Sequence, residues 1–274
     1  MVAQALEQID GVYQIGSLDD YKAFAELVNG GTTDANAVLT ADIDLGEDAT
    51  MIATSSEKPY TGVFDGQGHS ISIAWKDAVY DCGIFQYMSG TVRNLRVTGS
   101  LQSVNQHPGT IVGRAHDKGG TTIENVYCDV EMNITHGYDT GGGGIIAFSA
   151  GAYKMTNVVF AGKMIGDGVT EHCGGFVGWS GGTGDIKNCL FVGEVTGVAF
   201  NSLNSFNYVG RGPGAVWENV YYIPVGTDYI PSAYPLTAVE SEDVKSGALA
   251  FILNGYEQGG KNFYQTIGED EAPI

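Results

Sequence analysis

The sequence predicts an all-β fold, a single-stranded parallel β-helix with an N-terminal capping helix and a C-terminal helix and tail. Three observations predict it. A two-part unit recurs about every 31 residues, apolar residues within each unit alternate with a period of two, and 41 of the 274 residues are glycine without the three-residue period of collagen. A fixed period of 20 to 50 residues is typical of solenoids, and a period of two indicates strands. Glycine then marks tight turns.

One part of the unit is an asparagine followed by an apolar residue or cysteine. It recurs five times, at intervals of 31, 32, 31 and 31 residues, as Asn94, Asn125, Asn157, Asn188 and Asn219. In stacked coils the side-chain amides are expected to form a ladder that bonds the coils above and below. We interpret these asparagines as structural.

After each asparagine, the first and third residues are apolar or cysteine. They are predicted to form interior columns, as Leu95 and Val97, Val126 and Cys128, Val158 and Phe160, Cys189 and Phe191, and Val220 and Tyr222. The residues between them are predicted to point outward, as Arg96, Tyr127, Val159, Leu190 and Tyr221. The cysteines include no CxxC pair, so buried thiols are expected rather than a metal or redox site.

The N-terminal residues are predicted to form a helix that caps the first coil of the solenoid. Ser17 to Asp20 is typical of a capping box, an apolar stripe follows, and 29–31 ends the helix. Strands are expected within Ala37–Leu45 and Thr61–Ile73. A solenoid needs covers at its ends. We therefore predict one solenoid domain over 1–274, with an N-terminal cap at 11–36, coils at 37–225, and a C-terminal cap and tail at 226–274.

A second helix is predicted from Ser241 to Leu253. Its expected apolar face consists of Val244, Ala248, Phe251 and Ile252. Two capped ends favour a monomer, either alone or as part of a larger multidomain chain, because uncapped coils associate end to end.

The charge balance restricts the partners. Asp and Glu number 32 against 13 Lys and Arg, which gives a formal net charge of −19. Such a surface repels nucleic acid, anionic lipid and polyanionic sugars. The chain has no apolar run of about 18 residues, so no membrane insertion is expected.

A family resemblance emerges from three segments. Tyr60–Ile71 resembles the opening coil of right-handed β-helix surface proteins of gut and oral bacteria, Gly174–Gly178 resembles their GLUG motif, and Phe263–Gly268 is similar to their closing tail. The similarity covers about residues 11–270, although Gly143–Ala147 and Phe206–Gly210 depart from the motif. It implies that the parallel β-helix is right-handed, and it implies an extracellular or cell-surface location, with a leader removed before Met1. GLUG motifs also flank the protease domain of IgA-specific metallopeptidases, but the chain has no HExxH, so the resemblance implies no peptidase activity.

Recognisable catalytic sets are missing from the sequence. The adjacent pair Asp19 and Asp20 belongs to the predicted helix, and the glycine-rich segments have no P-loop spacing. We predict no catalytic residue, no metal and no cofactor.

One set of polar residues is the candidate ligand-binding edge. The second part of each unit is a short segment that we call the glycine segment, at 82–85, 109–113, 143–147, 174–178 and 206–210. The candidate residues lie in the turns before these segments, as Asp81, His107, His136, Tyr138, Asp139, Glu171 and His172. Coils are about 4.8 Å apart, so the edge would offer a polar groove to an extended glycan or peptide. Turns are also polar simply because they face water, and that alternative stays open.

The leading functional hypothesis is a non-catalytic, adhesin-like module of a bacterial surface protein that binds glycan or a host or bacterial surface protein. One alternative is a polysaccharide-active hydrolase or lyase that uses His136, Asp139, Glu171 and His172. A second alternative is a rigid structural spacer.

Overall fold

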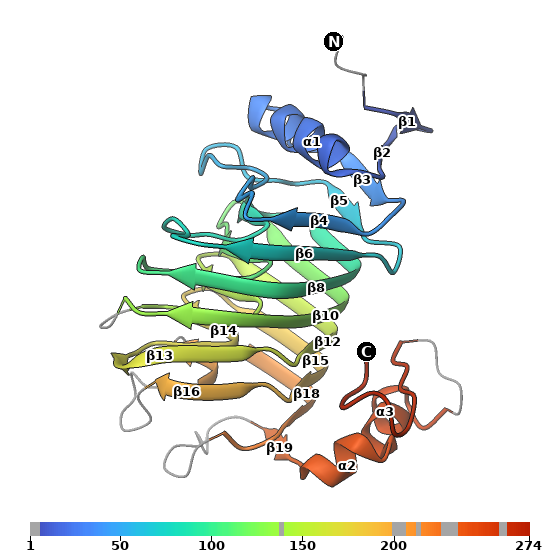
Figure 1. Cartoon of the computed structure of the whole chain (residues 1–274), viewed down its shortest axis with the longest axis vertical. Helices are drawn as coiled ribbons and strands as arrows, with labels where there is room; N and C mark the ends of the chain where they lie inside the picture. Colours follow the sequence, from blue (N-terminus) through green and yellow to red (C-terminus); the bar gives the residue numbers. More distant parts are fainter. Residues whose placement is uncertain (1–5, 137–139, 199–206, 212–214, 226–234, 258–261) are drawn as a thin grey trace.

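The computed structural model describes residues 6–136, 140–198, 207–211, 215–225, 235–257 and 262–274 (Figure 1). The chain is a parallel β-solenoid, as predicted. Every strand pairing in it is parallel, except that between β1 and β2. No helix in the described part of the chain is long and apolar enough to cross a membrane.

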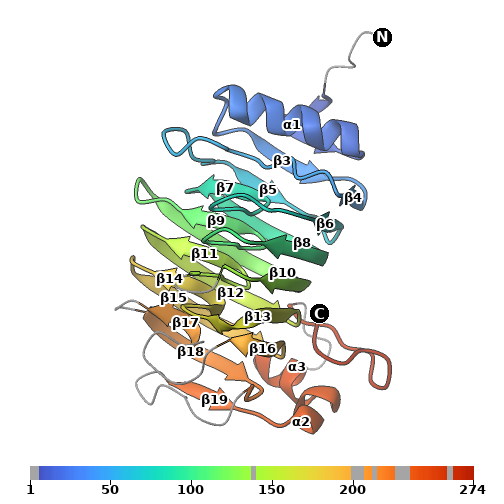
Figure 2. The same ribbon diagram turned by 60° about the vertical axis from the view of Figure 1, so that its left-hand side comes forward.

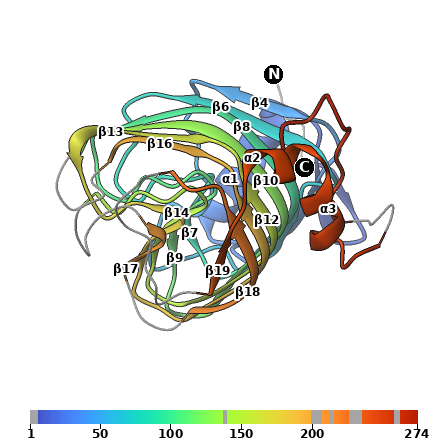
Figure 3. The ribbon, with the colours of Figure 1, turned by 90° about the horizontal axis from the view of Figure 1, so that it is seen from below.

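Two sheets form the wall of the solenoid. The wide sheet contains β1 (Gln8–Ile9), β2 (Val12–Ile15), β3 (Asn36–Leu39), β4 (Ile43–Gly46), β5 (Val63–Asp65), β6 (Ser70–Trp75), β8 (Thr91–Ser103), β10 (Gly120–Ile134), β12 (Ala152–Phe160), β13 (Lys163–Thr170), β15 (Gly184–Phe191), β16 (Glu194–Val198), β18 (Ala215–Tyr222) and β19 (Leu236–Ala238). The narrow sheet contains β7 (Phe85–Met88), β9 (Val112–Ala115), β11 (Ile146–Ser149), β14 (Gly174–Ser180) and β17 (Asn207–Arg211). The wide sheet curves around the interior, as the view from below shows (Figure 3).

The repeated asparagine is a corner of each coil. Asn94, Asn125, Asn157, Asn188 and Asn219 have φ angles of 51°, 52°, 57°, 51° and 54°. Asparagine tolerates this left-handed region better than most residues. The corner also sets the side-chain phase, because Val92 before Asn94 and Leu95 after it are both buried. A regular strand would have placed those two residues on opposite faces.

The predicted ladder forms, with one rung missing. Asn125 Nδ2 donates to Asn94 Oδ1 at 2.9 Å, Asn157 Nδ2 to Asn125 Oδ1 at 2.8 Å, and Asn219 Nδ2 to Asn188 Oδ1 at 3.1 Å. Asn157 Oδ1 has no hydrogen-bond partner, so the ladder is interrupted between Asn157 and Asn188. At its upper end, Asn94 Nδ2 donates to Asp65 Oδ1 at 2.9 Å, which makes Asp65 the first rung.

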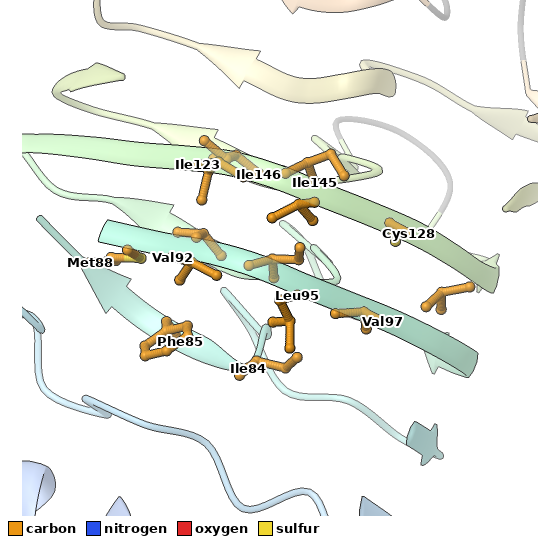
Figure 4. Close-up of a cluster of buried hydrophobic side chains, with 14 of the residues drawn as sticks. Ile84, Phe85, Met88, Val92, Leu95, Val97, Ile123, Cys128, Ile145 and Ile146 are labelled. Atoms are coloured by element: carbon orange, nitrogen blue, oxygen red, sulfur yellow. The ribbon is translucent and has the colours of Figure 1, made fainter. Parts of the chain in front are cut away.

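The interior columns are confirmed. All ten residues predicted to point inward are at most 3% exposed, and successive coils align Val97 with Cys128, Phe160, Phe191 and Tyr222. Figure 4 shows the same packing around Val92, Leu95 and Val97, which face the narrow-sheet residues Phe85 and Met88 across the interior. The four cysteines are buried and unpaired, as expected.

The N-terminal end is covered as predicted. Helix α1 (Leu18–Gly30) begins after Ser17, whose Oγ accepts a hydrogen bond from Asp20 N at 3.2 Å. Its apolar stripe, Tyr21, Phe24, Ala25 and Val28, is fully buried. The helix lies over the first coils (Figure 2). Strand β2 already pairs with β3, so the solenoid begins inside the segment expected to be the cap.

The prediction for the C-terminal helix was wrong in two respects. Ser241–Leu253 forms two short helices, α2 (Ser241–Lys245) and α3 (Ala248–Leu253), because Gly247 takes a left-handed φ of 80° between them. This break rotates the second helix, so Leu249, Ala250 and Leu253 are buried while Ala248 and Phe251 are exposed.

The C-terminal segment also lies beside the solenoid wall and not across its end (Figure 3). It covers the outward-pointing Val159 and Leu190, which join Val244, Leu253 and Phe263 in a second hydrophobic cluster separate from the interior. These outward positions are apolar in the later coils, which is why they need a cover, whereas Arg96 in an earlier coil is exposed.

Candidate functional site

A second corner precedes the strands of the narrow sheet. Asp81, His107, Gly141 and His172 occupy it in successive coils with φ angles of 54°, 58°, 62° and 58°. The structure therefore brings the predicted edge residues Asp81, His107 and His172 to equivalent places, with Glu171 next to His172. Gly141 takes the corresponding place in the coil between His107 and His172.

One other predicted edge residue lies apart from this corner. His136 is exposed, and its Nδ1 lies 2.9 Å from the backbone oxygen of Val104. Tyr138 and Asp139 lie outside the described residues.

Asp81 is the centre of a buried charge cluster. Its carboxylate is 1% exposed, with Oδ1 2.7 Å from His107 Nδ1 and Oδ2 accepting from Arg114 Nε at 2.8 Å. Burial acts to lower the pKa of Arg114, but its hydrogen bond with Asp81 and the charge of Asp81 outweigh burial and raise that pKa. Both carboxylate oxygens thus have hydrogen-bonding partners, as a buried polar group requires.

An outward row of side chains crosses the narrow sheet beside this cluster. Tyr87, Arg114, Phe148 and Trp179 are register partners in β7, β9, β11 and β14. Arg114 Cζ lies 4.2 Å from the Phe148 ring centroid, and the Phe148 and Trp179 rings stack at 6.1 Å with an interplanar angle of 27°. Both faces of Phe148 are therefore covered. Flat stacking of a sugar on Phe148 is therefore blocked.

A pocket of about 350 Å³ lies at the upper end of the row, and we call it the Tyr80 pocket. Its walls include Tyr80, Asp81, Tyr87, Arg114, His116 and Asp117. Tyr80 is 45% exposed and packs against His107 with ring centroids 4.9 Å apart. His116 Nδ1 lies 2.9 Å from Asp117 Oδ1, and the Asp117 side chain is 71% exposed. The pocket thus combines an exposed aromatic ring with several hydrogen-bonding groups.

Of the wall residues named here, only Asp81 was among the sequence-predicted candidates. Tyr87, Arg114, His116 and Asp117 follow the glycine segments, whereas the predicted edge precedes them. A usable signal was the scarcity of arginine, because Arg114 is one of only four in the chain. Its partner Asp81 lies 33 residues earlier, and only the coil register brings the two together.

The site offers little to a catalytic mechanism. Asp81 is inaccessible and held by Arg114 and His107, so it is poorly suited to donate a proton or attack a substrate. Burial raises the pKa of each of the four cysteine thiols to about 12, far above that of a reactive cysteine. Among the described residues, no group of three or more His, Cys, Asp or Glu side chains is placed to hold a metal ion.

Comparison with known proteins supports the fold. No family model matches the chain, and no curated protein matches its sequence. A solved structure, that of a putative immunoglobulin A1 protease from Bacteroides ovatus, superimposes with a TM-score of 0.65 at 17% sequence identity. The match covers 96% of this chain and 91% of the Bacteroides protein. At this identity the likeness concerns the architecture alone.

Proposed function

We propose that the chain is a non-catalytic, extracellular β-solenoid module of a bacterial surface protein, and that it binds a neutral glycan in the Tyr80 pocket. The observation that carries the proposal is the composition of this pocket. The exposed ring of Tyr80 stands beside the Asp81–Arg114 pair, and sugars are bound by aromatic rings together with polar groups that are fixed in place. A surface protein that binds a glycan through this module would attach to the surface carrying that glycan, as an adhesin does.

The charges of the pocket favour a neutral ligand. Arg114 is already neutralised by Asp81, and Asp117 is the exposed carboxylate at the rim. The whole chain carries −19, so a uronate or sulfated glycan would be repelled over a long range. Hydroxyl groups of a neutral sugar can donate to Asp117 and accept from Arg114 without this penalty.

The hydrolase form of the polysaccharide-active alternative requires two accessible carboxyl groups on either side of a sugar bond. In the Tyr80 pocket, Asp117 is accessible but Asp81 is 1% exposed. The protease assignment of the Bacteroides protein is not carried over, because the resemblance at 17% identity supports the fold alone.

The proposal is tested by screening the purified chain against neutral and acidic polysaccharides. Affinity electrophoresis would measure binding, and release of reducing ends or unsaturated products would measure cleavage. We expect retardation by a neutral polysaccharide without products, and loss of retardation in Tyr80→Ala and His116→Ala. Tyr256→Ala is the matched control, because Tyr256 is 69% exposed and lies far along the chain, in the C-terminal segment.

Three results would contradict the proposal. Product release would favour the enzyme, and retardation that survives Tyr80→Ala and His116→Ala would move the site elsewhere. Failure of every polysaccharide to bind would favour the rigid spacer or a protein ligand.

A further inference from the structure

A second cavity lies on the opposite side of the repeat, between the asparagine ladder and the C-terminal tail. Its volume is about 290 Å³, and we call it the ladder groove. Its walls include Asn94, Arg96, Asn125, Asn157, Val159 and Phe263. The volume is near the lower limit of about 300 Å³ for small-ligand sites. A ligand of this groove would therefore insert one chemical group, with the rest of the molecule outside.

The amides of the groove have unused hydrogen-bonding capacity. A side-chain amide carries two N–H donors and a carbonyl oxygen with two lone pairs. Asn125 uses one donor toward Asn94 and one lone pair toward Asn157, and its side chain is exposed. It therefore retains one donor and one lone pair. Asn157 is 9% exposed, and its Oδ1 is unpartnered. An amide group on a ligand has both an N–H donor and a carbonyl acceptor, so it can satisfy a free donor and a free acceptor of the groove at the same time.

Arg96 adds further donors at the same place. Its guanidinium lies 4.9 Å from the centroid of the Tyr127 ring. It makes no ion pair with any residue that the structure describes, in contrast to Arg93, which pairs with Asp65, and Arg114, which pairs with Asp81. A guanidinium fixed over an aromatic ring, with its N–H groups free, is suited to bind a carbonyl oxygen.

The remaining wall is apolar. Val159 and Phe263 are 1% and 4% exposed, and both belong to the hydrophobic cluster between the solenoid wall and the C-terminal segment. A methyl group on the ligand carbonyl would pack against them. The groove therefore offers an amide partner, a cationic donor for the carbonyl and an apolar contact for a methyl group.

We propose that the ladder groove binds the acetamido group of an N-acetylated sugar. The carbonyl oxygen accepts from Arg96 and from the free N–H of Asn125, the acetamido N–H donates to an asparagine oxygen, and the methyl group contacts Val159 and Phe263. This site is independent of the Tyr80 pocket, and its ligand differs from a plain neutral hexose by the acetamido group alone.

The test uses N-acetylglucosamine and glucose as probes, followed by NMR of the asparagine side-chain NH₂ groups and the arginine Nε–H. We expect N-acetylglucosamine to bind with a Kd of about 1–10 mM and glucose at least about tenfold more weakly. The shifted signals should be those of Asn94, Asn125, Asn157 and Arg96. Asn188 and Asn219 form the same kind of rung outside the groove and provide an internal control.

Arg96→Gln should weaken N-acetylglucosamine binding about five- to tenfold, and Arg96→Lys should weaken it less, because the positive charge remains. Lys187→Gln removes an exposed cation elsewhere on the wide sheet and should have no effect. Equal shifts with glucose would overturn the proposal, as would shifts at Asn188 and Asn219 equal to those in the groove. Absence of any shift, or full binding by Arg96→Gln, would overturn it as well. Tyr80→Ala, which tests the first pocket, should leave this binding intact.

Discussion

Asp81 Oδ2 accepts a hydrogen bond from Arg114 Nε at 2.8 Å, and this pair joins one coil of the narrow sheet to the next. The two residues are 33 positions apart, and Asp81 is 1% exposed. Removing one partner of a buried ion pair is strongly destabilising, because the other charge loses its compensation. The pair therefore matters to the stability of the coils as well as to the Tyr80 pocket.

Replacing Asp81 should test this role directly. Asp81→Ala leaves Arg114 and His107 without their shared acceptor, and we expect a loss of about 3 kcal/mol in the free energy of unfolding. Urea denaturation followed by circular dichroism measures it. Glu26→Ala, at an exposed carboxylate of α1, should change stability by less than about 0.5 kcal/mol. If the two substitutions lowered the free energy of unfolding equally, the buried pair would contribute no more to stability than an exposed carboxylate does.

The asparagine corner combines a backbone role with a side-chain role, and two substitutions separate them. Asn125→Ala removes two ladder hydrogen bonds and places alanine at a φ of 52°, so we expect a loss of about 2–4 kcal/mol. Asn125→Gly removes the same hydrogen bonds but tolerates this φ, so it should be about 1 kcal/mol less destabilising. Thermal and urea unfolding of both variants give the comparison. Identical losses would mean that the left-handed conformation costs alanine nothing here.

The architecture was predictable because it depends on a repeated local pattern. The asparagine corners and alternating residues such as Leu95 and Val97 determine which side chains face inward in every coil, so one unit predicts the others. The Tyr80 pocket does not repeat. It depends on which unlike residues the coil register aligns, such as Tyr87 with Arg114, and that register is not visible in one unit. The C-terminal helices were misassigned because a single left-handed glycine, Gly247, changed their phase.

The narrow sheet contains a close backbone approach that admits only glycine. A Cβ atom added at Gly113 would lie 1.8 Å from the backbone oxygen of Asp81 at the corner of the preceding coil, so the two coils would have to separate. We expect Gly113→Ala to destabilise the protein by more than about 3 kcal/mol and to disturb the Tyr80 pocket. Gly120→Ala is the matched control, because nothing lies within 4 Å of its added Cβ. Comparable melting temperatures for the two variants would contradict this prediction.

The burial of the four thiols predicts how fast they react with a labelling reagent and how the stability of the protein depends on pH. Burial raises their pKa values to about 12, whereas a cysteine in an unfolded chain has a pKa of about 8.5. The stability contributed by the neutral thiols is fully present below about 8.5. It is lost as the pH rises toward 12, because the unfolded chain releases protons that the folded chain retains.

Thiol labelling measures the accessibility of these cysteines. At pH 8, Cys82, Cys128, Cys173 and Cys189 should react with Ellman's reagent only as fast as the protein unfolds, and labelling should accelerate in urea along the unfolding transition. Ser100→Cys introduces a thiol at an exposed position of β8 and should label at once. Immediate labelling of the native thiols would show that the interior columns open locally, without unfolding of the whole solenoid.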